Sequence, residues 1–142
     1  MRLGSAAFAA GLALPAWAEQ IHVEPGSDLP AILRRAAEGD VIVLRPGEHR
    51  AQMRIDTTLT IAGEPGAILI GPGKGNVITV AAPRAVVRWL TVRGSGMDSE
   101  AMNAGVFVEK TATGAVIEKN LIEGNLYGIY LHGAEDAVAQ DN

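Results

Sequence analysis

The sequence predicts an all-β fold, a right-handed parallel β-helix in which successive coils of the chain stack on one another. Residues 105–108 (GVFV) return further along the chain as residues 128–131 (GIYL), and residues 116–120 (VIEKN) return as residues 138–142 (VAQDN). A period of this length is typical of a solenoid whose coils each supply two or three strands. Aromatic residues make up only 4% of the chain and there are 17 glycines, as expected for thin aliphatic layers joined by tight corners.

The repeated runs are predicted to be strands because they are short and alternate with period two. In the second copy, Ile129 and Leu131 point into the solenoid, whereas Tyr130 and His132 point outward. Stacking of coils at the ordinary inter-strand spacing of about 4.8 Å places Tyr130 over Phe107. Glycine and asparagine are expected at the corners, where a positive φ is needed.

Residues 1–18 have the features of a secretory signal peptide and are not expected to be part of the fold. Arg2 supplies the positive charge, residues 3–15 are apolar, and residues 16–18 (AWA) form a cleavage site of the A-x-A type. We expect cleavage after Ala18, export to the periplasm, and a β-helix domain at residues 19–142. No other stretch is apolar over the roughly 18 residues that a membrane helix needs, so no direct membrane span is predicted.

The charge and the absence of cysteine narrow the kinds of partner. The chain has 12 lysines and arginines against 16 acidic residues, and it has no cysteine. This balance argues against nucleic acid as a partner, because phosphate binding relies on a basic patch. Without cysteine there are no disulfides, and a soft-metal site has to use methionine and histidine.

The beginning of the mature chain predicts a strand and then a helix that closes the end of the solenoid. The strand at residues 20–24 ends at a Pro-Gly turn, and Ser27 or Asp28 caps the helix, with Pro30 in its first turn. The apolar positions of the helix share one face: Leu29, Ile32, Leu33 and Ala36. Such a cover is needed because the first coil would otherwise expose its core and its unpaired strand edges.

Further strands are expected at residues 41–44, 58–63 and 86–93. The step from Val86 to Val116 is longer than the repeat described above, and the surplus falls in residues 95–104. We expect a loop of about eight extra residues that projects from a corner of the solenoid, where insertions frequently carry the binding surface.

This loop contains the candidate site. Met97 and Met102 carry thioethers, which select Cu(I) among available metals, and His132 on the outer face is the best of the three histidines to join them. Copper is the metal that these residue types favour, and the sequence establishes no cofactor.

The same loop is a candidate surface for contact with a partner, and a passive loop is the alternative. The residues predicted to make this contact are Met97, Asp98, Glu100, Met102 and Tyr130. Asp98 and Glu100 also offer two carboxyl groups, but glycoside hydrolysis needs two such groups facing one bond at a set separation. Two acidic residues on a loop do not establish that geometry, so no catalytic residue is predicted.

Two parts of the chain resemble a known family. Gly39-Asp40, the strand at residues 41–44 and Pro46-Gly47 resemble the start of the pectin-lyase-like β-helix superfamily, with His49 where an aromatic residue is usual. Residues 86–96 and the corner at residues 120–125 narrow the resemblance to the N-terminal part of the NosD family. That family is longer, so we expect this chain to be truncated within a coil at its C-terminal end.

The resemblance implies a periplasmic accessory protein that is not an enzyme. Such a protein takes part in assembling the copper site of nitrous oxide reductase, together with an ABC-type ATPase and its membrane subunits. Two other functions stay open on the sequence alone. One is a carbohydrate-binding or carbohydrate-processing β-helix, and the other is an inactive, truncated repeat fragment.

Overall fold

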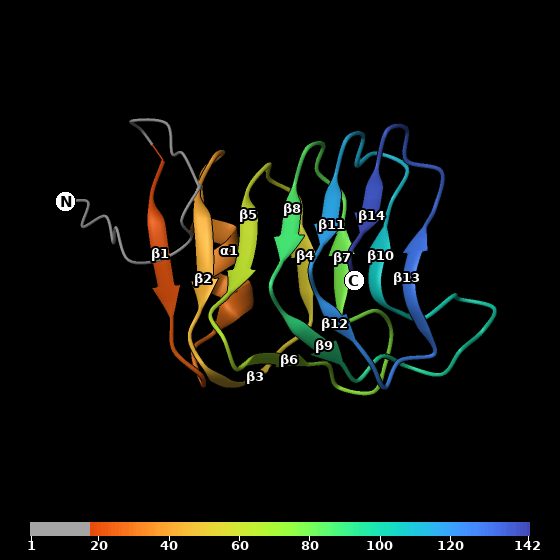
Figure 1. The fold of residues 1–142 in the computed structure, drawn as a ribbon, viewed down its shortest axis with the longest axis horizontal. Helices are drawn as coiled ribbons and strands as arrows, with labels where there is room; N and C mark the ends of the chain where they lie inside the picture. The colour runs from red at the N-terminus through yellow and green to blue at the C-terminus, as the bar shows by residue number, and fades with distance from the viewer. Residues whose placement is uncertain (1–17) are drawn as a thin grey trace.

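The predicted parallel β-helix is confirmed by the computed structural model, which describes residues 18–142. The chain winds through about five coils, and its strands form three parallel sheets that run along the solenoid (Figure 1). Apart from Ala18, the predicted signal peptide lies outside the described residues. Within residues 18–142, no helix is long and apolar enough to cross a membrane.

Each sheet collects one strand from each successive coil. Sheet A contains β1 (Gln20–Val23), β2 (Val41–Leu44), β5 (Thr60–Gly63), β8 (Val86–Arg88), β11 (Val116–Glu118) and β14 (Val138–Gln140). Sheet B contains β3 (Gly47–Arg50), β6 (Ala67–Ile70), β9 (Thr91–Arg93) and β12 (Leu121–Ile122). Sheet C contains β4 (Met53–Ile55), β7 (Ile78–Val80), β10 (Ala104–Val108) and β13 (Tyr127–Leu131).

The core is a set of aliphatic columns inside the solenoid. Side chains alternate along each strand, so that in β4 Met53 and Ile55 are buried while Arg54 between them is exposed. One coil after another repeats this arrangement, and Val87 of β8 pairs in register with Ile61 on one side and Ile117 on the other. These stacked side chains exclude water from the interior coils, where Ile61, Val87 and Ile117 are fully buried.

The register predicted from the two repeated runs is confirmed. In sheet C, Phe107 pairs with Tyr130 and Val108 pairs with Leu131. In sheet A, Val116 pairs with Val138. The sequence also predicted that Leu131 points into the solenoid and is buried. Its side chain is 43% exposed, so this part of the prediction was wrong. Its strand β13 is the end strand of sheet C, so no described coil covers its far side.

The predicted helix is present as α1 (Leu29–Arg35) and lies behind β2 and β5 in Figure 1, at the N-terminal end of sheet C. Asp28 caps it, since its Oδ1 accepts a hydrogen bond from the backbone N–H of Ala31 at 3.1 Å, which satisfies one of the free donors of the first turn. Leu29 and Leu33 are buried in the core. The helix packs against β4, the first strand of sheet C, where it covers that strand edge.

Asparagines line one corner of the solenoid. Asn120 is buried, its Oδ1 accepts from Leu90 N–H at 3.0 Å, and its Nδ2 donates to the Val87 carbonyl at 3.1 Å. Asn142 repeats the arrangement one coil later, donating from Nδ2 to the Ile117 carbonyl at 2.9 Å. The positive φ at this corner belongs to the preceding residue, Lys119 at 56°, and not to asparagine as expected. Asparagine is used here for its side-chain amide.

The difference in burial between Val108 of β10 and Leu131 of the end strand β13 gives a stability prediction. Val108 is 0% exposed, so Val108→Asp should lower the free energy of unfolding by several kcal/mol, because it buries a carboxylate without a partner. Leu131→Asp, at the paired position one coil later, should cost roughly 1 kcal/mol, since water reaches the new carboxylate. Urea titrations of both variants measure this difference. Equal losses would show that the two positions do not differ in burial as described.

Candidate functional site

The loop predicted at residues 95–104 is present and joins β9 to β10 (Figure 1). Two side chains hold it together. Asp98 Oδ1 accepts hydrogen bonds from the N–H groups of Glu100 and Ala101, at 3.0 and 3.1 Å. The buried Asn103 accepts from Asp98 N–H at 3.1 Å through its Oδ1. The loop therefore has a defined backbone shape on which its outward side chains are displayed.

The two methionines of the loop differ in accessibility. Met97 is 74% exposed, whereas Met102 is half-buried and lies in a turn with a φ of 56°. Asp98 and Glu100 are both exposed, although one oxygen of Asp98 already serves the loop backbone. Of the residues predicted for partner contact, Met97, Asp98 and Glu100 are exposed, whereas Met102 and Tyr130 are half-buried.

His132 does not join the methionines. The loop precedes the start of β10, whereas His132 follows the end of β13, the strand paired with β10. Met102 and His132 therefore lie at opposite ends of this strand pair, which the strand rise converts to a separation of roughly 20 Å. Residues 18–142 also contain no group of three or more histidines and acidic residues able to hold a metal ion. A metal bound by Met97 and Met102 would thus need its other ligands from elsewhere.

Aromatic rings gather on the outer face of sheet C instead. The rings of Phe107 and Tyr130 stack with centroids 5.5 Å apart and planes 2° from parallel. His132 lies 5.4 Å from Phe107, and Tyr127 meets Tyr130 edge to face at 5.8 Å. Tyr130 over Phe107 follows the predicted register. Tyr127 and His132 extend this pair to a four-ring cluster, which we call the ring cluster.

An ion pair crosses the same face between distant coils. Arg54 of β4 donates to both carboxylate oxygens of Glu109, each at 2.9 Å, and its Nε donates to Asp56 at 2.9 Å. The hydrogen bonds with Arg54 hold the pKa of Glu109 below its ordinary value and raise the pKa of Arg54 above its own. The short side chain of Thr79, in register between Arg54 and Phe107, leaves room for the guanidinium to pass over β7.

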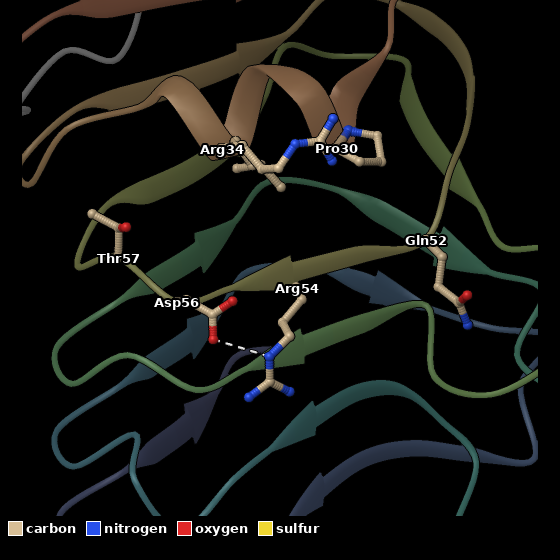
Figure 2. A pocket seen from close by; sticks show the side chains of 7 residues that line it. Pro30, Arg34, Gln52, Arg54, Asp56 and Thr57 are labelled. Atoms are coloured by element: carbon tan, nitrogen blue, oxygen red, sulfur yellow. Dashed lines mark hydrogen bonds and ion pairs between the residues drawn. The ribbon is translucent and has the colours of Figure 1, made fainter.

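A pocket of about 370 Å³ lies between α1 and β4 (Figure 2). Pro30, Leu33 and Arg34 line it from the helix, and the region of β4 supplies Gln52, Arg54, Asp56 and Thr57. Arg54 extends away from the helix towards Asp56 (Figure 2). Among the described residues Arg34 has no acidic partner, so its guanidinium is free to meet a ligand.

Neither this pocket nor the ion pair beside it was predicted from the sequence. Arg54 stands alone between Met53 and Ile55 in a short strand, and its partner Glu109 comes from a distant part of the chain. Arg34 looks like an ordinary surface residue of the helix. The available signal was the alternation around Arg54, which marks it as outward-facing, but the register that brings Glu109 to it was not visible in the repeats.

Comparison with known proteins supports the resemblance found in the sequence. The chain is 34% identical over 121 residues to a protein of Pseudomonas aeruginosa named "Probable ABC transporter binding protein NosD", covering 85% of this chain and 28% of the relative. A protein of the same name from Stutzerimonas stutzeri is 31% identical over 93 residues, covering 66% and 21%. The chain thus spans between a fifth and a third of the length of these relatives. No family model matches.

Solved structures show the same fold at low sequence identity. A pectin methylesterase variant in complex with a hexasaccharide has a TM-score of 0.64 at 17% identity, covering 84% of this chain and 48% of that chain. A second pectin methylesterase complex with a hexasaccharide has a TM-score of 0.58 at 18% identity, covering 75% and 40%. The chain therefore has a pectin-lyase-like β-helix fold and is similar in sequence to NosD.

Proposed function

We propose that this chain serves as a periplasmic accessory protein in the maturation of nitrous oxide reductase, acting with an ABC-type transporter and performing no catalysis itself. The observation that carries the proposal is its similarity to two proteins named as ABC transporter binding proteins, at 31 and 34% identity. In this proposal the leader at residues 1–18 directs export and is then removed.

The loop at residues 95–104, which we call the Met97 loop, is the part of the β-helix that we assign to copper in this role. A solvent-facing thioether can take up Cu(I), which soft sulfur ligands favour over harder cations. Because His132 lies at the other end of sheet C, the third ligand has to be supplied by a docked partner. The loop would then hand copper over within a complex, and Glu100 beside Met97 would contribute to docking.

Removal of both thioethers tests the copper role. In a strain that depends on this protein, Met97→Leu together with Met102→Leu should lower the copper content of purified nitrous oxide reductase several-fold when copper is limiting. Leucine keeps size and apolarity while removing sulfur, and elemental analysis of the reductase gives the readout. Met53→Leu is the matched control, since Met53 is buried in the core and should leave copper loading unchanged. A fully loaded reductase with the double variant would rule out thioether ligation.

The expected processing has a structural consequence of its own. The backbone nitrogen of Glu19 donates to Oδ1 of Asp40 at 2.8 Å, and Asp40 is buried. Cleavage after Ala18 would convert this nitrogen to an ammonium group, turning the hydrogen bond into an ion pair, which is stronger. Mass spectrometry of the exported protein should therefore find Glu19 as the first residue. Asp40→Asn should destabilise the processed protein, and an intact leader on the exported protein would contradict the assignment.

Binding of an acidic oligosaccharide is the second candidate function, and the pocket between α1 and β4 favours it. Its volume of about 370 Å³ suits a small ligand, and Arg34 offers a cation that carboxylates pair with. The pectin methylesterases of the same fold were solved with hexasaccharides. The ring cluster lies further along the same face of sheet C and would extend the contact.

Titration calorimetry with hexagalacturonate, and with a neutral hexasaccharide for comparison, tests this second function. Arg34→Ala should weaken binding of the acidic ligand by roughly tenfold, the loss expected for one charged hydrogen bond. Arg35→Ala is the control, because Arg35 follows on the same helix but does not line the pocket. If the acidic ligand does not bind, or if both variants bind it equally well, this function is excluded for the pocket.

A further inference from the structure

The corners between sheets B and C leave a hollow between the first two coils that contain these sheets. Residues 51–52 join β3 to β4, whereas residues 71–77 join β6 to β7. The second corner is the longer one, so it extends beyond the first, and we call residues 71–77 the corner loop. A pocket of about 350 Å³ lies where the corner loop meets the first corner.

The described residues that line this pocket are mainly apolar, and none is aromatic. They are Arg50, Ala51, Gln52, Ile70, Gly71 and Pro72. Ile70 is the largest apolar side chain of the set and is half-buried on the outer face of β6. A pocket of this size and lining suits an aliphatic side chain, which gains by leaving water.

Contacts on both sides hold the corner loop in one shape. The Nε2 atom of Gln52 donates to the carbonyls of Lys74 and Asn76, at 2.7 and 2.8 Å. On the other side, a Cβ on Gly71 would lie only 2.6 Å from the carbonyl oxygen of Gly94, so glycine is needed for this close approach of the next coil. The pocket is therefore formed before a ligand arrives, which lowers the entropy cost of binding.

The side-chain amide of Gln52 also offers an acceptor. Because both hydrogens of Nε2 face carbonyl oxygens, the Oε1 atom points away from these two carbonyls. Within residues 18–142 this oxygen has no hydrogen-bond partner. It can accept from the backbone N–H of an extended ligand, so a ligand with a peptide backbone fits the pocket.

Lys74 carries the unbalanced charge beside the pocket. Arg50 and Arg93 share the carboxylate of Glu48, with Nη2 atoms 2.8 and 3.6 Å from its oxygens, and Arg93 also meets Glu123 at 4.0 Å. Lys74 is exposed and has no acidic partner in the part of the chain that the structure describes. Its backbone is fixed beside the pocket, so its ammonium group is available to a carboxylate of the ligand.

We propose that this pocket docks an extended acidic segment of a partner protein. One aliphatic side chain of the segment fills the pocket against Ile70, a backbone N–H donates to Oε1 of Gln52, and a neighbouring carboxylate pairs with Lys74. The apolar anchor supplies affinity, and the charge at the rim selects an acidic partner. No residue of the Met97 loop lines the pocket, and docking here depends on neither proposed function.

A short capped peptide, in which a leucine is flanked on each side by aspartate and glutamate, tests the proposal. Titrated into the isotope-labelled chain, it should give saturable shifts in the amide NMR signals of Ala51, Ile70 and Gly71. Replacing its leucine by alanine should weaken binding at least about tenfold, since this removes most of the buried apolar area. Replacing its acidic residues by lysine should weaken binding at low ionic strength, and less so when salt screens the charges.

Two matched pairs of variants locate the binding. Ile70→Asp should weaken the leucine peptide at least about tenfold. Ile68→Asp, on the same outer face of β6 but outside the pocket, should change its affinity by less than about twofold. Lys74→Glu should weaken it several-fold, and Lys110→Glu, at an exposed lysine on another corner, is the control. None of the four side chains belongs to the buried core, so all four variants should fold.

Three results would overturn the proposal. The first is the absence of saturable shifts at the pocket, or equal effects of the two variants within either pair. The second is self-association of the chain that Ile70→Asp abolishes in sedimentation equilibrium, which would assign the pocket to a second copy. The third is a loss of hexagalacturonate binding with Ile70→Asp while the peptide still binds, which would assign the pocket to a saccharide.

Discussion

The parallel pairing of each strand with its counterpart one coil away is the constraint on which the rest of this structure depends. It fixes which side chains stack, since Val87 can lie between Ile61 and Ile117 only in one register. A slip of one residue would turn every buried side chain outward. The dry aliphatic interior and the buried corner amide of Asn120 both follow from this register, and so does the order of side chains on the outer faces.

The outer face of sheet C shows how this register creates surfaces that no single coil contains. Arg54 and Glu109 come from coils two strands apart, and the small Thr79 between them lets their side chains meet. Half-exposed ion pairs of this kind contribute only about 0–1 kcal/mol to stability. The pair matters more for the shape of the pocket between α1 and β4. It holds the Arg54 side chain away from the helix, and Arg34 on the helix has no acidic partner among the described residues. The loop at residues 95–104 lies at the opposite margin of sheet C from His132.

The parts of the fold that could be predicted from the sequence are those with local or repeated signals. The capping helix follows from Asp28 and the spacing of Leu29 and Leu33, and the stacking of Tyr130 on Phe107 follows from the repeat. The register of the earlier coils cannot be read from the sequence, because these coils differ in length. The step along the chain from Val41 to its partner Thr60 is much shorter than the step from Val86 to Val116. The Arg54–Glu109 pair depends on that hidden register, so it could not be predicted. The exposure of Leu131 has another cause, the place of β13 as the end strand of sheet C, which the alternation along the strand does not reveal.

Amide hydrogen exchange resolved strand by strand is the measurement that tests most directly whether coil-on-coil pairing stabilises the protein. If it does, amides of β5 and β8, which are paired on both sides, should exchange slowest, at rates close to those of global unfolding. Amides of β12, β13 and β14 should exchange much faster, because their coil is covered on one side only. Uniform protection along the solenoid, or slower exchange at β14 than at β5, would contradict this account.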